Sequence, residues 1–316
     1  MTVLSPSPQP SPARRLACAL VLACALPTAA AAPLRTVVDD AGRRVSVPLP
    51  PLRIVSLAPG ATAMLFEAGA GAQVLATSAY SLEPPAARRL PRIGDAYSVD
   101  LERLLSLHPD VVVVWDGGNN PAQIERIARL GIPLYRERVQ RLADMPASLR
   151  RLGRLAGTGA AADAAAQRFA VRLAALRERY RGAAPITVLL EVLRHPLYTL
   201  GPREAVSDAL GICGAQNIFE DLGPLASAVS TEAVIARDPQ VIIALASRAE
   251  GAAWLADWRR FPQLNAVRDG NLLDFDDLRL TRLGPAMLDA TEELCALIDR
   301  ARARARDRRG RPALSP

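Results

Sequence analysis

Residues 160–180 read AAADAAAQRFAVRLAALRERY, a stretch of the 316-residue chain that contains neither Gly nor Pro. Its apolar side chains recur at steps of three and four, the spacing of an amphipathic helix, whereas arginines fall on another face. Such a helix is about 30 Å long, at about 1.5 Å per residue. A packed helix connects more stiffly than a Gly/Ser linker does. The apolar face consists of Ala162, Ala166, Phe169, Leu173, Leu176 and Tyr180.

The sequence repeats itself on the two sides of this helix. Leu101-Glu102-Arg103-Leu104-Leu105, with Pro109 after it, matches Thr231-Glu232-Ala233-Val234-Ile235, with Pro239 after it, at a constant offset of 130 positions. In both halves, short apolar runs alternate with helical segments, which is typical of an α/β fold with a mainly parallel, covered sheet. The sequence therefore predicts two similar α/β lobes joined by one long rigid α-helix.

The predicted domain limits follow from these patterns. The N-terminal lobe covers residues 52–148, the bridging helix 158–182 and the C-terminal lobe 185–300. Residues 301–316 are expected to form a disordered basic tail. Two lobes held by a stiff helix leave a cleft between them, which is the usual place for a ligand.

Charge does not indicate a nucleic-acid partner. The chain has 39 basic and 32 acidic residues, a formal net charge of +7, and every basic residue is an arginine. However, residues 300–316 hold seven of these arginines against one acidic residue, and two more lie near the N-terminus. The remainder is close to neutral and has no basic stripe of the kind that binds nucleic acid.

The N-terminus has the order of a secretory signal. Arg14 and Arg15 precede an apolar run over 16–26, and small residues follow at 28–32. This order predicts a signal peptide over 1–31 and a periplasmic protein. No later segment has the roughly 18 uncharged apolar residues of a membrane span. Lipid anchoring at Cys24 is the less favoured alternative.

Two cysteines, Cys213 and Cys295, remain once the signal is removed. An even pair in an oxidising compartment favours a disulfide, and the alternative is two buried free thiols. A catalytic cysteine is disfavoured because the chain has just two histidines, His108 and His195, to serve as a partner.

No enzyme is expected. The sequence lacks a Walker loop, an HExxH motif, a GxSxG elbow and a CxxC pair. Two distant histidines also cannot form a metal site by themselves, so neither a metal nor a cofactor is expected. A secreted α/β enzyme stays an alternative, and it would need a nucleophile with a histidine partner.

Aromatic residues are scarce, at 4% of the chain, and four of them fall at or near the ends of predicted strands. Loops at strand ends are where α/β folds place ligand contacts. Core packing is the alternative for each of them. The four residues, which could together line a cleft, are Tyr80, Tyr97, Trp115 and Tyr198.

A family resemblance covers the chain from about Arg53 to Arg300. The seven stretches that carry it are Arg53-Ile-Val-Ser-Leu-Ala-Pro, Tyr80-Ser-Leu-Glu-Pro-Pro, Asp100-Leu-Glu-Arg-Leu, His108-Pro-Asp-Val-Val-Val-Val-Trp, Leu130-Gly-Ile-Pro, Cys213-Gly-Ala-Gln-Asn-Ile-Phe and Ser230-Thr-Glu-Ala-Val-Ile-Ala-Arg-Asp-Pro. They resemble the periplasmic cobalamin-binding proteins of ABC importers, within the helix-bridged (class III) solute-binding proteins. That wider family carries cobalamin, haem, ferric siderophores or metal ions.

The resemblance implies a monomer that captures cobalamin (vitamin B12) between its lobes and delivers it to an inner-membrane ABC permease with two like subunits. Haem or a ferric siderophore is the alternative ligand. Ala96 and Ala226 stand where cobalamin binders of this type have tryptophan, and Tyr97 is a candidate replacement. Carried over by position, the ligand contacts are Tyr80, Trp115, Tyr198, Leu278, Arg279, Leu280, Thr281 and Arg282, the permease-docking carboxylates are Glu102 and Glu232, and the disulfide joins Cys213 to Cys295.

Overall fold

The computed structural model describes residues 33–50, 52–202, 204–223 and 226–310, and the chain from residue 33 onward forms one compact unit. The predicted signal peptide and Cys24 lie outside the described residues. Among the residues described, no helix is both long and apolar enough to cross a membrane.

The N-terminal lobe contains a four-stranded parallel sheet in the order β4-β3-β5-β6. All four valines of its strand β5 are buried, as expected for a β-branched run covered on both faces. A hairpin, β1 (Leu34–Val38) with β2 (Arg44–Pro48), precedes this sheet. The sheet strands and the helices are β3 (Ile54–Ser56), β4 (Val74–Thr77), β5 (Val111–Trp115), β6 (Leu134–Glu137), α1 (Pro59–Glu67), η1 (Gly71–Gln73), η2 (Pro85–Arg89), α2 (Leu101–Ser106), α3 (Pro121–Arg129), η3 (Leu142–Asp144) and α4 (Met145–Ala156).

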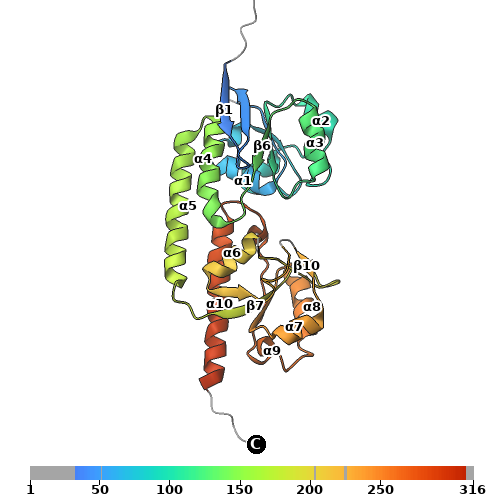
Figure 1. Cartoon of the computed structure of the whole chain (residues 1–316), viewed down its shortest axis with the longest axis vertical. Coiled ribbons are helices and arrows are strands. Elements are labelled where there is room, and N and C mark those ends of the chain that lie inside the picture. The colour runs from blue at the N-terminus through green and yellow to red at the C-terminus, as the bar shows by residue number, and fades with distance from the viewer. Residues whose placement is uncertain (1–32, 51, 203, 224–225, 311–316) are drawn as a thin grey trace, which may run out of the picture. The chain divides into compact units, whose positions relative to one another are not determined.

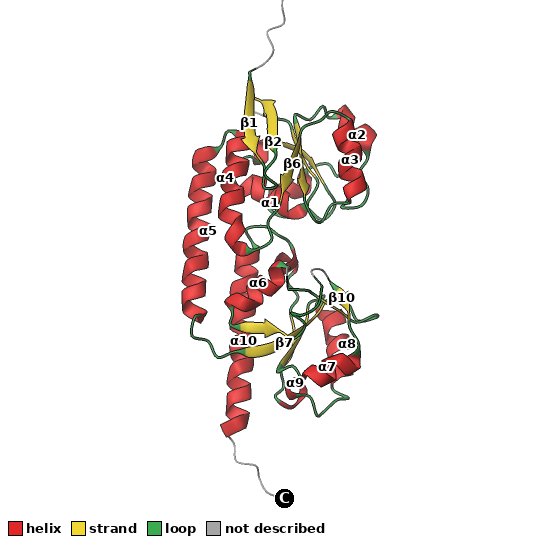
Figure 2. Cartoon of the chain, in the orientation of Figure 1, coloured by secondary structure: helices red, strands yellow, loops and turns green. Residues whose placement is uncertain are grey.

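The C-terminal lobe contains a second four-stranded parallel sheet, in the order β12-β11-β7-β9 (Figures 1 and 2). A short antiparallel pair, β8 (Tyr198–Thr199) with β10 (Ser227–Ala228), lies outside it. The sheet strands and the helices are β7 (Ile186–Glu191), β9 (Ala215–Asn217), β11 (Val241–Ala244), β12 (Leu272–Asp274), α6 (Ala205–Ile212), α7 (Thr231–Arg237), α8 (Arg248–Trp258), α9 (Asn265–Arg268), η4 (Leu278–Thr281) and α10 (Met287–Gly310).

The two lobes repeat each other in detail, which confirms the predicted fold. Read from opposite ends, the two sheets place equivalent strands in the same order. Helices α2 and α7 begin after equivalent caps, since the side chains of Asp100 and Ser230 each accept a hydrogen bond from a backbone N–H in the first turn. The same helices are followed by residues with positive φ, His108 at 43° and Asp238 at 42°. The 130-residue offset therefore extends to backbone conformation.

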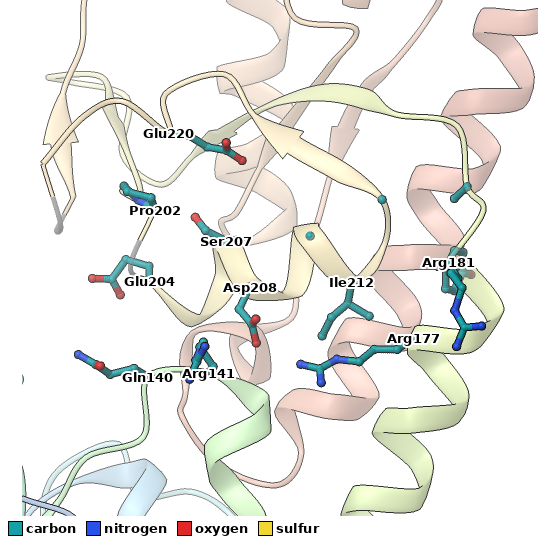
Figure 3. Close-up of a pocket in the computed structure, with 14 residues that line it drawn as sticks. Gln140, Arg141, Arg177, Arg181, Pro202, Glu204, Ser207, Asp208, Ile212 and Glu220 are labelled. Carbon is teal, nitrogen blue, oxygen red and sulfur yellow. The ribbon is translucent and has the colours of Figure 1, made fainter.

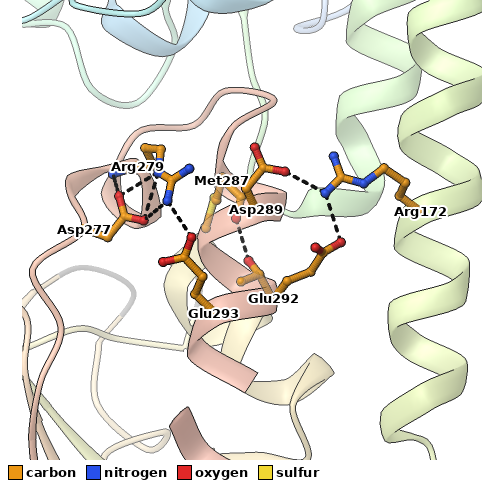
Figure 4. Close-up of polar contacts among 8 residues, drawn as sticks. Arg172, Asp277, Arg279, Met287, Asp289, Glu292 and Glu293 are labelled. Atoms are coloured by element: carbon orange, nitrogen blue, oxygen red, sulfur yellow. Dashed lines mark hydrogen bonds and ion pairs between the residues drawn. The ribbon is translucent and has the colours of Figure 1, made fainter. Parts of the chain in front are cut away.

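The helix expected over 160–180 is α5 (Gly159–Tyr180), which follows α4 through a left-handed Gly157. Its apolar stripe is buried against both lobes. Close packing against α4 requires the glycine at 153, because a Cβ there would overlap the Ala162 side chain. On its other side, Arg172 bonds to Asp289 and Glu292 of α10, at 2.6 and 3.0 Å (Figure 4). Contacts on two sides keep α5 straight.

The structure differs from the expected disorder over 301–310, because α10 continues to Gly310, whereas residues 311–316 of the predicted tail lie outside the described residues. Ala301 and Ala305 are buried one helical turn apart, so this segment has an apolar face that the arginine count concealed. Arg302 is also buried, and its Nε donates to the Ala184 carbonyl at 2.7 Å. Packing and capping of backbone carbonyls hold the helix in place.

The disulfide is present, and the alternative of two free thiols is wrong. Cys213 follows α6 and Cys295 lies in α10, with 4.8 Å between their Cα atoms and 82 residues between them in sequence. Both cysteines are fully buried. The bond therefore ties the C-terminal helix to the core of its lobe.

Candidate functional site

The two lobes meet where the N-terminus of α1 touches the segment before α10. Gly60 lies against Leu283 so closely that an added Cβ would overlap its carbonyl group. Gly284 in turn packs near the Ala63 side chain, which a Cβ would approach to 3.2 Å. Glycine at both positions therefore lets the backbones of the two lobes approach each other.

Two small cavities flank this contact and are lined from both lobes. The first, of about 20 Å³, is lined by Tyr80 and Glu83 from one lobe and Arg279 from the other. The second, of about 90 Å³, is lined by Trp115, Glu137 and Thr281. Arg282 lines both cavities. The structure thus brings together five of the predicted contact residues: Tyr80, Trp115, Arg279, Thr281 and Arg282.

Tyr80 has the unusual combination of an exposed ring and a left-handed backbone. Its side chain is 70% exposed and its φ is 63°. A non-glycine residue rarely adopts this conformation, and such residues cluster at ligand sites, where the surroundings impose the strain. Tyr80 follows β4 at the carboxyl end of the sheet, as predicted from the sequence.

Trp115 is the last residue of β5 and is half-buried. Its backbone N–H donates to the side chain of Asn119 at 2.7 Å, and the Asn119 amide in turn donates to the Leu57 carbonyl at 2.9 Å. The indole ring lies on Gly118, where a Cβ would overlap the ring atoms. The polar turn seen in the sequence therefore fixes both the backbone and the ring of Trp115.

The segment that contains η4 has two arginines, of which Arg279 forms side-chain ion pairs and Arg282 forms none with the described residues. Arg279 bonds to Asp277 and also reaches Glu293 of α10 at 2.8 Å (Figure 4). Burial opposes ionisation of Asp277, yet hydrogen bonds from Arg279 hold the pKa of its carboxyl below the ordinary value. Arg282, three residues later, makes no side-chain ion pair with any residue that the structure describes.

Four predicted contacts lie elsewhere. Leu280 is completely buried, so its side chain faces the core and not a ligand. Tyr97 is 76% exposed in a turn closed by Asp95, and Leu278 is also exposed. Tyr198 is half-buried in β8, where it pairs with Ala228. None of these four lines the two cavities described above.

Glu137, the last residue of β6, was missed by the sequence analysis. It is 1% exposed, and its Oε1 has no hydrogen-bond partner in the described part of the chain. Burial, and then the negative charge of Asp40, raise the pKa of its carboxyl well above the ordinary value. The signal available in the sequence is an acidic residue that follows the apolar residues Leu134 and Tyr135 and lies beside Trp115 at the end of the sheet.

A larger cavity, of about 740 Å³, lies between the end of α5 and α6 (Figure 3). Its charged lining mixes both signs, and burial raises the pKa of Glu204. Asp208, which lines this cavity, accepts a hydrogen bond from the Leu142 N–H at 2.9 Å. Its carboxylate is therefore already used in a contact between the lobes. The cavity contains none of the predicted contact residues. Its charged residues are Arg141, Arg177, Arg181, Glu204, Asp208 and Glu220.

The predicted docking carboxylates are accessible. Glu102 and Glu232 are exposed, and each is the second residue of its helix, α2 or α7. A hydrogen bond from its own backbone N–H, and then one from Ser230, lower the pKa of Glu232.

A family model described as periplasmic binding protein matches residues 54–277. The chain belongs to the periplasmic binding protein family. Its relatives include the vitamin B12-binding protein of Vibrio cholerae serotype O1, 32% identical over 252 residues, which are 79% of this chain and 90% of the relative. The vitamin B12-binding protein of Pectobacterium atrosepticum is 34% identical over 251 residues, 78% of this chain and 88% of the relative.

Solved structures of other family members agree with this fold. The periplasmic vitamin B12 binding protein BtuF of Vibrio cholerae matches with a TM-score of 0.74 and 31% identity, over 81% of this chain and 99% of that one. The periplasmic heme-binding protein RhuT from Roseiflexus sp. RS-1 matches with a TM-score of 0.69 and 26% identity, over 79% of this chain and 98% of RhuT. The chain is a binding protein, not an enzyme.

Proposed function

We propose that this periplasmic binding protein captures cobalamin between its two lobes and delivers it to an inner-membrane ABC permease. The observation that carries the proposal is the match to vitamin B12-binding proteins at 32% and 34% identity over most of both chains. It is supported by the aromatic residues Tyr80 and Trp115, which flank the lobe contact on its two sides. Flat aromatic rings suit a large ring system such as a corrin.

The two cavities are too small to enclose such a ligand, because small-molecule sites usually measure about 300–1,000 Å³. Cobalamin therefore rests across the mouths of both cavities, between the lobes. Tyr80 and Trp115 contact the macrocycle, and Arg282 reaches its polar periphery. Tyr97, Tyr198, Leu278, Arg279 and Thr281 complete the wall.

Glu102 and Glu232 dock on permease arginines. One carboxylate from each lobe suits a permease with two like subunits, because charge pairs across such an interface fix orientation and speed encounter. The protein acts as a monomer in the periplasm, which it reaches through the signal peptide over residues 1–31.

Haem is the second candidate ligand. The similarity to the heme-binding protein RhuT, at 26% identity, favours it, and so does the loss of tryptophan at positions 96 and 226. Cobalamin and haem both absorb visible light, so one experiment shows which of them the protein binds. The protein is incubated with cyanocobalamin, haem or a ferric siderophore and passed through a desalting column. Cyanocobalamin absorbance alone should co-elute with the protein, and exclusive retention of haem or of the siderophore would contradict the proposal.

A further inference from the structure

The cavity beside Trp115 contains a polar arrangement that no part of the fold explains. Glu137 lines it from the N-terminal lobe, and Arg282 lines it from the C-terminal lobe. The Glu137 side chain is buried with Oε1 unsatisfied, and Arg282 pairs with no acid within the described residues. A buried polar atom without a partner destabilises the folded protein, so its retention calls for a role.

The surroundings of Glu137 show why the fold leaves it unpartnered. The nearby carboxylate of Asp40 takes the available donors: Arg151 Nη1 at 2.9 Å, Ser148 Oγ at 2.6 Å and Tyr135 Oη at 3.1 Å. The Asp40 carboxylate is thereby fully occupied, also by the Arg138 N–H at 3.1 Å, and its negative charge helps to raise the pKa of Glu137. The one side of Glu137 that remains is the cavity, which also faces Trp115 and Arg282.

Glu137 Oε1 is the unsatisfied group, whereas Arg282 is partly exposed and its charge also helps to lower the pKa of Asp277, so the two side chains call for different partners. Glu137 offers an acceptor oxygen, whereas a guanidinium such as that of Arg282 is a donor only. A primary carboxamide supplies both matching parts in one plane, N–H donors and a carbonyl acceptor. A carboxylate on the ligand matches Arg282 but has no donor for ionised Glu137, and it would add negative charge near Asp40 and Glu137, which the raised pKa of Glu137 shows to be unfavourable there.

We propose that Glu137 is a specificity-determining residue that accepts a hydrogen bond from a carboxamide arm of the ligand, while Arg282 donates to the carbonyl of the same arm. This inference rests on the proposed function, and it gives that function a chemical basis for selection. Corrinoids such as cobalamin carry carboxamide arms around the ring, whereas haem carries carboxylates. Glu137 thus favours the binding of corrinoids over the binding of haem.

The test compares two ligands that share a corrin ring: dicyanocobinamide, which has amide arms, and dicyanocobyrinic acid, which has carboxylates. Affinities are measured by absorbance titration for the wild type, Glu137→Leu and Glu137→Gln. Glu125→Leu is the control, because Glu125 is an exposed carboxylate on α3 in the same lobe. Thermal melting checks that each variant is folded.

Wild-type protein should prefer the amide ligand. Glu137→Leu should weaken dicyanocobinamide binding about tenfold and reduce the ratio of the two affinities by a similar factor. Compared with ionised Glu137, the glutamine of Glu137→Gln keeps an acceptor and adds a donor. In titrations above the raised pKa of Glu137, this variant should therefore bind the amide ligand within about threefold of wild type and bind the carboxylate ligand more tightly. If the Glu137→Leu variant does not fold, the affinities of Glu137→Gln for the two ligands are sufficient for the test. The control should match wild type.

Two failures are distinguishable. If wild-type protein binds neither cyanocobalamin nor dicyanocobinamide, the proposed function fails and this inference with it. If wild-type protein binds them but the Glu137 variants keep its affinity ratio, the proposed function stands and the role of Glu137 is overturned.

Discussion

Glu102 and Glu232 are equivalent residues in the two lobes, 130 positions apart, each exposed and each two residues after the cap of its helix. An acidic residue in a first helical turn stabilises a protein by about 0.3–1 kcal/mol, which explains either residue taken alone. The helix-end explanation does not account for the equivalence of the two positions. The docking role does, since it requires one exposed carboxylate per lobe.

Charge reversal at both positions tests this role. The double variant Glu102→Arg with Glu232→Arg should abolish complex formation with the permease and transport by the assembled importer. Ligand affinity should be unchanged, and the thermal melting temperature should fall slightly, because the exposed charges contribute little to stability. Co-purification with the permease and uptake by reconstituted vesicles provide the measurements.

A control for this experiment is available in the same chain. Glu125 on α3 and Glu250 on α8 are also exposed helical acids, one in each lobe. Reversing both should leave the complex intact. A complex of normal affinity with the Glu102 and Glu232 double variant would instead leave the helix-end role as the sole explanation.

Removal of the Trp115 ring should weaken cobalamin binding. Trp115→Ala should cost roughly 1–3 kcal/mol, the scale of a buried aromatic contact. Trp254→Ala is the matched control, because this half-buried indole on α8 lines neither cavity and should leave affinity unchanged. Calorimetric titration measures both variants. Equal affinities of folded Trp115→Ala and wild type would remove Trp115 from the site.

Loss of the disulfide should lower stability and spare binding. Replacing Cys213 and Cys295 by serine opens an 82-residue loop. The expected loss in free energy of unfolding is about 2–5 kcal/mol, which urea denaturation detects. The bond lies in the core of the C-terminal lobe, away from both cavities, so the affinity of the folded variant for cobalamin should stay within about twofold. A variant as stable as wild type would show that the bond contributes nothing to the native state.

Glu137 makes stability depend on pH in a definite direction. Its pKa is raised in the folded protein, so its contribution is fully present below the unfolded value of about 4.3 and is lost as pH rises toward the folded value. The Glu137→Gln variant has no titrating group at this position, so it does not lose stability in this way as pH rises. Its stability relative to wild type should grow between pH 4 and pH 8, by up to about 1.4 kcal/mol per pH unit within the titration range. Melting curves across this range should show no such trend for the exposed control Glu125→Gln.

The sequence could predict the fold because its signals are local and repeated. The α5 stripe and the β-branched run of β5 each lie within one element, whereas the 130-residue repeat is visible by comparing two stretches of the sequence, and the structure confirms all three. The expectation of disorder was wrong over 301–310 because the arginine count hides an alanine face, which includes Ala301 and Ala305. Only packing against the lobe distinguishes such a helix from a solvated tail.

The site was predicted less completely because it forms between distant segments. Tyr80 and Trp115 could be placed from strand ends, where one lobe alone decides the position. The burial of Leu280 and the isolation of Glu137 depend on contacts that no single segment encodes. The positive φ of Tyr80 likewise has no sequence signal, since tyrosine does not favour that conformation.

The most direct test of the central claim is a calorimetric titration. The protein is purified from a periplasmic extract and titrated first with cyanocobalamin and then, in a separate experiment, with haem. The account predicts saturable binding of one cyanocobalamin per chain and much weaker binding of haem. Absence of heat and of bound corrinoid with cyanocobalamin, from protein that melts cooperatively, would contradict it.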